Sequence, residues 1–378
     1  MASILAGLIL AFCGSLTSII SVRTRLTTYL LIQRSFGQFG AALVNIVIAL
    51  TLFGWFGVNA SFFGSAMVAA VQQLWGIEGH FSTYVIAGSI LMTASTVFGF
   101  KTLEKLALVA VPVLGIVLAL VCLIALQKHG VTLSPSNHPP VPMSFGIALS
   151  ALVGGNMVTV ATMPDLSRYI RSARGSVFSM VLSFPIATPI MMIAAALPAL
   201  ATREIDIMKL VIQFGLGVPA LLAMVLSIWV LNASNVYSAG LSLAATFPSV
   251  RTWIFVLIGG ICGTTFALLG IIDSFIPFLL FLGVIIPPIA AIFVIDGFFL
   301  FRGADAAESI QSLPWMRWPA VGTWIASVAI VLAANWAGLS LTGVPMFDAT
   351  VFAALLYFAV LQLERRLAPN SAATVTEG

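Results

Sequence analysis

Charged side chains are scarce in this sequence, since only 7% of its 378 residues are Asp, Glu, Lys or Arg. An ordinary soluble domain carries about 25%, so a soluble protein of this length would have too few polar side chains to cover its surface. Hydrophobic residues reach 61% and form many runs close to the ~20 residues that cross a bilayer. The composition predicts a polytopic α-helical membrane protein that has the lipid bilayer as its surroundings. The basic residues form no long run or basic face, which argues against nucleic acid as a partner.

Residues that bind metals or catalyse reactions are also few. The three cysteines lie singly in apolar stretches, and the three histidines lie in short polar loops. These residues are Cys13, Cys122, Cys262, His80, His129 and His138. Their spacing fits neither a metal site nor a redox pair. Because nucleophile–base pairs, phosphate loops and paired catalytic carboxylates are missing as well, the sequence predicts no enzyme activity, no catalytic residue, no metal and no cofactor.

Eleven apolar segments follow one another along the chain, with no soluble domain between them. They run near 2–22, 40–70, 83–100, 106–126, 143–164, 176–201, 210–245, 251–270, 274–299, 319–338 and 349–363. We therefore expect residues 1–366 to form one transmembrane domain of about eleven spans. Residues 367–378 are short and polar, and we expect a disordered cytoplasmic tail there.

The basic residues predict how these spans are oriented. If the loop after the first span lies on side one, that side holds 13 of the 16 Lys and Arg residues and the other side holds 3. Positively charged loops stay in the cytoplasm, which places side one and the C-terminus on the cytoplasmic face of the plasma membrane. The first span would then start outside, although the chain begins at its edge. This topology indicates that an earlier helix is absent from the sequence.

Polar side chains inside a span are costly and mark functional or helix-bridging positions. In the second span, Thr51, Trp55 and Asn59 are four residues apart and share one helix face. Trp55 lies at mid-span, away from the interfacial belt where tryptophan collects. Two interpretations stay open: an aromatic platform for a flat ligand, or a tight helix–helix contact that the neighbouring glycines allow.

The fifth span contains Gly154-Gly155-Asn156, a combination that weakens a helix in mid-membrane. Discontinuous helices in transporters offer free backbone groups to substrates and ions, but the same residues would also suit a small-residue packing groove. Near the end of this span, Asp165 and Arg168 are three residues apart and can pair. That spacing favours a structural clasp or gate over a site of chemistry.

The seventh span carries Asn232 and Asn235 on one face. An Asn amide offers two donors and an acceptor, so this pair can read the edge of a heterocycle or bridge two helices. In the ninth span, Pro287 and Pro288 interrupt helical hydrogen bonding and predict a kink before Asp296.

At these positions the chain resembles the nucleobase–cation symporter family, which includes cytosine, purine, allantoin and hydantoin permeases. The matching stretches occur in family order along nearly the whole chain, and cytosine permeases are the nearest match overall. They are 27–31, 35–37, 54–58, 164–169, 232–237, 286–288 and 295–296.

The resemblance implies an all-α transporter fold of two inverted five-helix repeats followed by two additional helices, with the family's first helix absent here. It implies a secondary transporter that imports a nucleobase or a related heterocycle, such as a purine, pyrimidine, hydantoin or allantoin, by alternating access. A non-transporting truncated remnant, or a receptor-like membrane protein, is the alternative that the absent helix motivates.

The resemblance also implies roles for single residues, with Trp55 stacking on the substrate ring and the span-seven asparagines bonding its edge. The candidate substrate-binding residues are Trp55, Asn59, Gly155, Asn156, Asn232 and Asn235. Cytosine permeases carry Gln where this chain has Leu52 and an aromatic residue near Asn156. The polar groups of the expected pocket are therefore redistributed relative to those permeases.

The coupling cation follows from the same helix. Sodium-coupled members of the family present side-chain oxygens at two adjacent positions, which here are Val230 and Leu231, with Ser227 one turn earlier. Hydrocarbon side chains cannot replace the water oxygens that a hard cation loses on binding, and each oxygen ligand that is not replaced costs several kcal/mol of binding free energy. The sequence therefore favours protons over sodium as the coupling cation. Asp165 and Asp296 are the nearest titratable groups.

Overall fold

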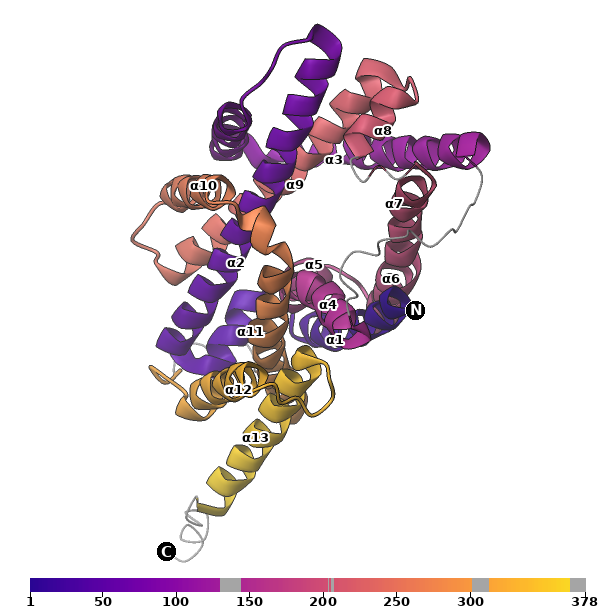
Figure 1. Ribbon diagram of the computed structural model, residues 1–378. Coiled ribbons are helices and arrows are strands. Elements are labelled where there is room, and N and C mark those ends of the chain that lie inside the picture. The colour runs from indigo at the N-terminus through magenta and orange to yellow at the C-terminus, as the bar shows by residue number, and fades with distance from the viewer. Residues whose placement is uncertain (130–143, 203, 205–206, 301–312, 368–378) are drawn as a thin grey trace, which may run out of the picture. The chain divides into compact units, whose positions relative to one another are not determined.

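The structure is a computed structural model, and it describes residues 1–129, 144–202, 204, 207–300 and 313–367. Helices make up nearly all of these ranges, and no strand occurs within them (Figure 1). The helices are α1 (Ala2–Thr24), α2 (Thr28–Trp75), α3 (Phe81–His129), α4 (Phe145–Thr162), α5 (Pro164–Ser167), α6 (Ala173–Leu182), η1 (Ser183–Ala187), α7 (Thr188–Thr202), α8 (Ile207–Gln213), α9 (Gly217–Thr246), α10 (Thr252–Leu268), η2 (Ile271–Ser274), α11 (Phe275–Ile295), η3 (Asp296–Leu300), α12 (Trp318–Trp336) and α13 (Pro345–Leu367). The predicted tail after residue 367 lies outside the described residues.

Eight helical stretches in the described part of the chain are long and apolar enough to cross a membrane. They are Ala2–Thr24, Thr28–Trp75, Phe145–Ser167, Ala173–Thr202, Leu221–Thr246, Ile271–Phe299, Trp318–Trp336 and Pro345–Glu364. Three shorter apolar helices accompany them: Phe81–Val97, Pro112–Lys128 and Thr252–Leu268. Each of these stretches overlaps one of the apolar segments expected from the sequence.

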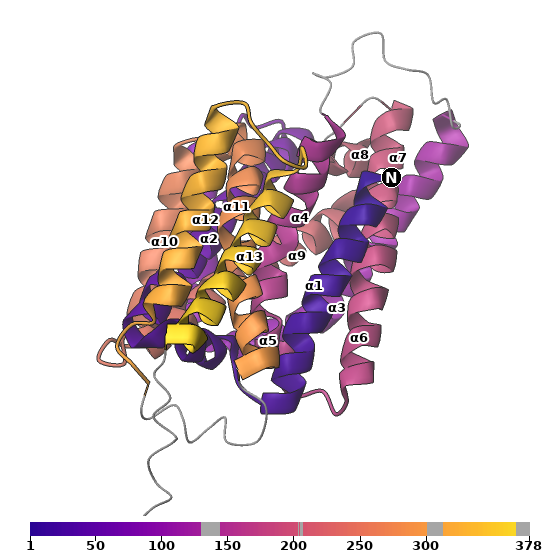
Figure 2. The same cartoon turned by 90° about the horizontal axis from the view of Figure 1, so that it is seen from below.

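The chain divides into two compact units, each assembled from stretches that are distant in sequence. Unit 1 contains Met1–Val44, Ser144–Leu182 and Leu279–Gly378, and unit 2 contains Asn45–Met143 and Ser183–Phe278. Within unit 1, α1 packs against α4, α5 and α6, and α12 packs against α13 (Figure 2). Within unit 2, α3 packs against α7, α9 and α10.

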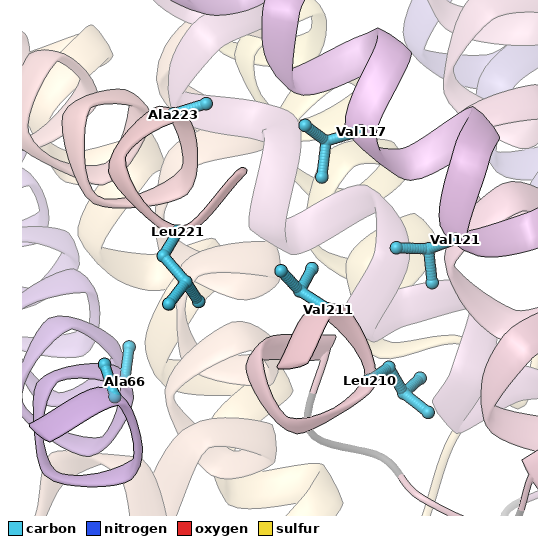
Figure 3. Packing of buried hydrophobic residues seen from close by; sticks show 8 residues of the cluster. Ala66, Val117, Val121, Leu210, Val211, Leu221 and Ala223 are labelled. Carbon is cyan, nitrogen blue, oxygen red and sulfur yellow. The ribbon is translucent and has the colours of Figure 1, made fainter. Parts of the chain in front are cut away.

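A hydrophobic core of unit 2 forms where the end of α2, α3, α8 and the start of α9 meet (Figure 3). Leu210 and Val211 of the short helix α8 are fully buried in it. Their partners are Ala66, Ala70, Val117, Val121, Leu221 and Ala223. Small and branched side chains allow the close contacts on which dispersion attraction depends, so a helix of only seven residues is held firmly.

Glycine conformation explains two departures from the expected segments. The segment expected at 210–245 is split into α8 and α9, because Gly215 and Gly217 adopt positive φ angles of 71° and 70° that other residues disfavour. Helix α2 begins at Thr28 rather than near residue 40 and is broken at Gly37, where φ is 79°. A Cβ at position 37 would lie 2.7 Å from the carbonyl oxygen of Pro314, so only glycine lets these backbones pass.

The prolines of α11 do not end that helix. Pro287 and Pro288 lie inside the continuous helix Phe275–Ile295, which passes into a π-helical turn at Asp296. The indole Nε1 of Trp324 on α12 donates to the carbonyl of Ile285 (3.1 Å). This bond ties α12 to α11 just before the prolines.

Candidate functional site

Trp55 lies on α2 in unit 2, among other aromatic rings. Its indole makes edge-to-face contacts with Phe275 (centroids 6.1 Å apart) and Phe278 (5.8 Å). A Cβ on Gly54 would lie 2.7 Å from the Phe278 ring, so this glycine allows a close approach, as the helix-contact interpretation of this segment expects. The indole itself is half-buried, and part of its surface stays accessible.

Asn232 lies where α9 meets α2 and α3. Its side chain is 0% exposed, and its Nδ2 donates to the Phe56 carbonyl (3.2 Å) and to Met92 Sδ (3.4 Å). Because a carbonyl only accepts hydrogen bonds, the contact with Phe56 determines which amide atom is nitrogen. The Oδ1 atom has no hydrogen-bond partner among the described residues. Asn232 thus bridges helices on one side and presents a buried acceptor on the other.

Asn59 follows Trp55 by one turn and is 8% exposed. Its Nδ2 is buried and, within the described part of the chain, lacks a hydrogen-bond partner. Asn235 is half-buried on α9 in the same unit. A donor on Asn59 and an acceptor on Asn232 are therefore both unsatisfied, and a buried polar group left in that state costs about 1–3 kcal/mol.

The sequence interpretation missed Trp229, which precedes Asn232 by one turn on α9. Its Nε1 donates to Ser95 Oγ on α3 (2.9 Å), and Ser95 Oγ in turn lies 2.8 Å from the Met92 carbonyl. The three-residue spacing between Trp229 and Asn232 was visible in the sequence. Their partners on α3 were not, since they lie more than 130 residues away.

The helix break expected at Gly154-Gly155-Asn156 is absent, because α4 runs unbroken from Phe145 to Thr162. Gly154 packs against the backbone of Leu279 and Gly283 on α11, with no room for a Cβ. Asn156 donates Nδ2 to the Leu152 carbonyl of its own helix (3.0 Å). The small-residue packing groove is thus the interpretation that the structure favours for Gly154, while Gly155 and Asn156 are half-buried in unit 1.

Asp165 and Arg168, also in unit 1, do not form the expected ion pair; the described residues contain only two such pairs, and both lie elsewhere. Asp165 Oδ1 instead accepts from the backbone N–H of Thr28 (2.8 Å), at the start of α2. The first N–H groups of a helix lack intrahelical partners, and a carboxylate there is a favourable cap. Arg168 lies over the Tyr169 ring, 4.6 Å from its centroid.

A ladder of three side chains, two on α1 and one at its C-terminal cap, joins this helix to α4 and α5. Thr17 donates to the Val160 carbonyl (3.0 Å), Ser21 donates to the Pro164 carbonyl (2.8 Å), and Arg25 donates to the Arg168 carbonyl. The donors are four residues apart, as are the acceptors. Pro164 has no N–H to offer the carbonyl of Val160. The Met163 N–H makes a long bond to that carbonyl (3.4 Å), and Thr17 adds a shorter one. The spacing of polar residues on α1 is the sequence signal that could have revealed this ladder.

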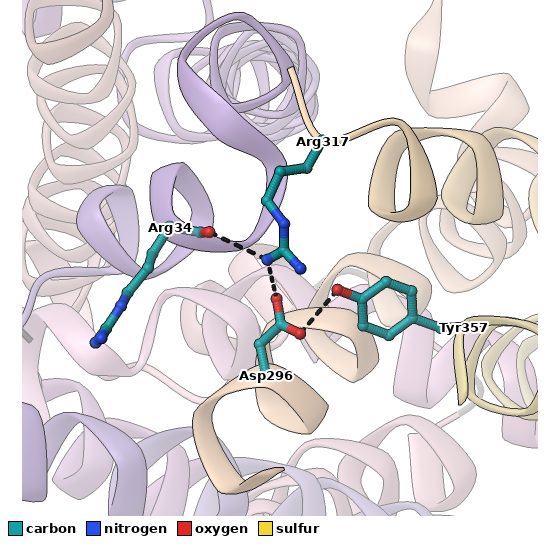
Figure 4. A network of polar contacts seen from close by, with 4 residues as sticks. All are labelled: Arg34, Asp296, Arg317 and Tyr357. Atoms are coloured by element: carbon teal, nitrogen blue, oxygen red, sulfur yellow. Dashed lines mark hydrogen bonds and ion pairs between the residues drawn. The ribbon is translucent and has the colours of Figure 1, made fainter. Parts of the chain in front are cut away.

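A second polar network of unit 1 is centred on Asp296 (Figure 4). Its side chain is 0% exposed; one oxygen pairs with Arg317 Nη1 (2.8 Å) and the other accepts from the Tyr357 hydroxyl (2.7 Å). Arg317 Nη1 also lies 3.3 Å from the Arg34 carbonyl. The network ties the end of α11 to α2, α12 and α13. Asp296 therefore has a structural role, which its position near the end of a span did not predict.

Three solved structures of membrane transporters are similar to this chain in fold. The TM-score is 0.77 to Mhp1, a nucleobase-cation-symport-1 family transporter, in a closed conformation with bromovinylhydantoin bound; the identity is 17%, over 97% of this chain and 86% of that one. The TM-score to Mhp1 in an inward-facing conformation is 0.74, at 15% identity over 97% of this chain and 83% of that one. A Na⁺-coupled sialic acid symporter in its substrate-bound outward-open state reaches 0.60, at 14% identity over 94% and 83%. The fold is therefore the inverted-repeat fold of secondary transporters, as expected.

Sequence relatives narrow this class. Residues 1–361 match the family described as permease for cytosine/purines, uracil, thiamine, allantoin. Cytosine permeases of Escherichia coli O157:H7 and of strain K12 are each 30% identical over 362 residues, which cover 94% of this chain and 82% of theirs. The chain belongs to this permease family. It is an integral membrane transporter rather than an enzyme, which confirms the family and class expected from the sequence.

Proposed function

We propose that the chain imports a nucleobase or a closely related small heterocycle across the plasma membrane by alternating access. The observation that carries this proposal is the unsatisfied donor of Asn59 and acceptor of Asn232, in the unit that holds a half-buried Trp55. The family match over residues 1–361 supports it.

The chemistry of these groups fits a flat, uncharged ligand. An indole presents a broad π surface on which a heterocyclic ring can stack. The amides of Asn59, Asn232 and Asn235 can read donors and acceptors on the ring's edge without adding charge. We assign stacking to Trp55 and edge recognition to these three asparagines. Gly155 and Asn156 of α4 are proposed as further substrate contacts.

Asp165 and Arg168 are proposed as parts of a gate rather than of the binding pocket. Asp165 caps the start of α2, and the Arg168 carbonyl accepts from Arg25 at the end of α1. Together these bonds hold the connection between α1 and α2 against α5, at the end of unit 1 that the positive-inside rule assigns to the cytoplasm.

We further propose that protons drive uptake. Val230 is buried and Leu231 is exposed, and neither side chain has an oxygen to offer a cation. Ser227, one turn earlier, directs its hydroxyl to the Ala223 carbonyl of its own helix (2.8 Å). The Ser227 oxygen keeps lone pairs that could bind a cation, but one hydroxyl does not replace the several oxygen ligands that a sodium ion prefers.

Uptake of radiolabelled substrates into cells that express the chain tests the proposed function. The panel comprises cytosine, adenine, uracil, a hydantoin and allantoin, with empty-vector cells as the background. We expect saturable uptake of at least one of them, inhibited by unlabelled compounds of the same shape. If the protein reaches the membrane but no compound enters above background, the non-transporting alternative is favoured instead.

A further inference from the structure

Five arginines gather at one end of unit 1. They come from the last turn of α1, its C-terminal cap, and the stretch from α5 to the start of α6. They are Arg23, Arg25, Arg168, Arg171 and Arg174. Helix α1 packs against both α5 and α6, and Figure 2 shows the end of α1 beside the start of α6. Arg25 donates to the Ile170 carbonyl (2.7 Å), which places it against the loop that carries Arg171.

The arginine cluster carries a large excess of positive charge. Among the described residues, none of the five forms an ion pair. Arg25 bonds backbone carbonyls, Arg168 bonds the Tyr169 hydroxyl, and Arg23 lies over the Phe298 ring. Arg171 and Arg174 are exposed. Asp165, whose Oδ1 accepts from the Thr28 N–H, also interacts electrostatically with Arg168, but one carboxylate leaves most of the charge of five arginines unbalanced.

Apolar side chains lie exposed beside these charges. Leu166 is 69% exposed, Tyr169 73% and Phe178 67%. Phe178 belongs to the apolar stretch Ala173–Thr202, one of those able to cross a membrane. Arg174 lies in the first turn of α6, one turn before Phe178, where the N-terminal end of the helix also carries partial positive charge. A molecule with an anionic head and a hydrocarbon tail is complementary to this combination.

We propose that the arginine cluster binds the headgroup of an anionic phospholipid, with the phosphate between Arg171 and Arg174 and an acyl chain along Phe178. Guanidinium groups suit phosphate because they donate two parallel hydrogen bonds. Basic residues next to a span attract anionic lipid by about 1 kcal/mol each, a constant that converts to roughly fivefold in affinity per arginine. Two arginines therefore contribute about 25-fold.

The test measures lipid binding to the purified chain by native mass spectrometry, during titration with phosphatidylglycerol or phosphatidylcholine. In the variant Arg171→Gln/Arg174→Gln, phosphatidylglycerol affinity should fall about 25-fold while phosphatidylcholine binding stays unchanged. The control Arg251→Gln/Arg366→Gln removes the same charge from exposed arginines outside the cluster and should lose clearly less phosphatidylglycerol affinity, because these two arginines are far apart in the chain and do not form a pair like Arg171 and Arg174. Equal losses in the two variants would overturn the proposal.

Two further measurements keep the proposal testable. Arg171→Lys/Arg174→Lys keeps the charge but loses the bidentate geometry, and we expect intermediate affinity if the Gln variant does not fold. Inorganic phosphate, added in place of lipid, should not displace bound phosphatidylglycerol. If it does so at matched concentration, the site is one for a free anion and the lipid assignment is wrong. The readout is lipid binding rather than uptake, so its outcome is separate from that of the transport assay.

Discussion

Single side chains of unit 2 carry the recognition that we propose, and Trp55 is the most direct to test. Aromatic contacts contribute about 0.5–1.5 kcal/mol beyond the area they bury, which corresponds to about two- to tenfold in affinity. We therefore expect Trp55→Ala to raise the concentration for half-maximal uptake by that factor. Trp55→Phe keeps a ring and should lose less. Wild-type affinity in a well-expressed Trp55→Ala variant would remove the indole from the proposed site.

Asn232 is a second single residue to test, because its two amide atoms have different expected roles in binding and in packing. Its Nδ2 holds α9 to α2 through the Phe56 carbonyl, while its Oδ1 lacks a partner among the described residues. Losing one member of a buried hydrogen bond costs about 1–3 kcal/mol. We expect Asn232→Ala to lower both the melting temperature and the substrate affinity, measured by thermal unfolding in detergent and by uptake. A lower melting temperature with unchanged affinity would leave Asn232 with a purely structural role.

At the scale of helices, the ladder between α1 and the α4–α5 junction joins segments that are more than 140 residues apart. It adds a bond to the Val160 carbonyl, which lacks the usual N–H donor at Pro164 and receives a long bond from the Met163 N–H (3.4 Å). Because both rows repeat every four residues, the ladder follows the helical pitch and resists sliding of one helix along the other. We infer that α1, α4 and α5 move as one piece.

The ladder predicts unequal effects for three hydroxyl deletions on α1. Thr17→Val and Ser21→Ala each remove a bond between helices, so each should lower the free energy of unfolding by about 1 kcal/mol. Ser15→Ala is the matched control, because its hydroxyl bonds only the Ala11 carbonyl of its own helix (2.6 Å). Thermal unfolding of the three variants checks this order. Equal melting temperatures for all three would mean that the ladder adds no stability.

For the whole transporter, the coupling ion decides which gradient drives accumulation. Proteoliposomes containing the chain allow a pH gradient and a sodium gradient to be imposed separately. We expect substrate to accumulate under an inward proton gradient without sodium, and no accumulation under a sodium gradient at constant pH. The hydrocarbon side chains of Val230 and Leu231 are the reason. Accumulation that follows sodium alone would show that other oxygens supply the cation site.

Local sequence properties account for much of this protein. Hydropathy summed over about 20 residues locates membrane spans, and each apolar stretch of the structure overlaps an expected segment. Helix ends were less predictable where glycine takes a positive φ, as at Gly37 and Gly215. Gly154 was open to two interpretations, because glycine occurs both at helix breaks and at close contacts between helices. Its packing against α11 shows that it makes a close contact.

By itself, the amino-acid sequence determined that the chain is a helical membrane protein and that it belongs to the permease family for cytosine/purines, uracil, thiamine, allantoin. Only the tertiary structure decided which polar groups meet. Asp165 caps Thr28, 137 residues earlier, rather than pairing with Arg168 three residues on. Asp296 is shared by Arg317 and Tyr357. The physical reason is that hydropathy is a sum over neighbours in sequence, whereas a buried hydrogen bond depends on which distant backbone or side chain folding brings within about 3 Å.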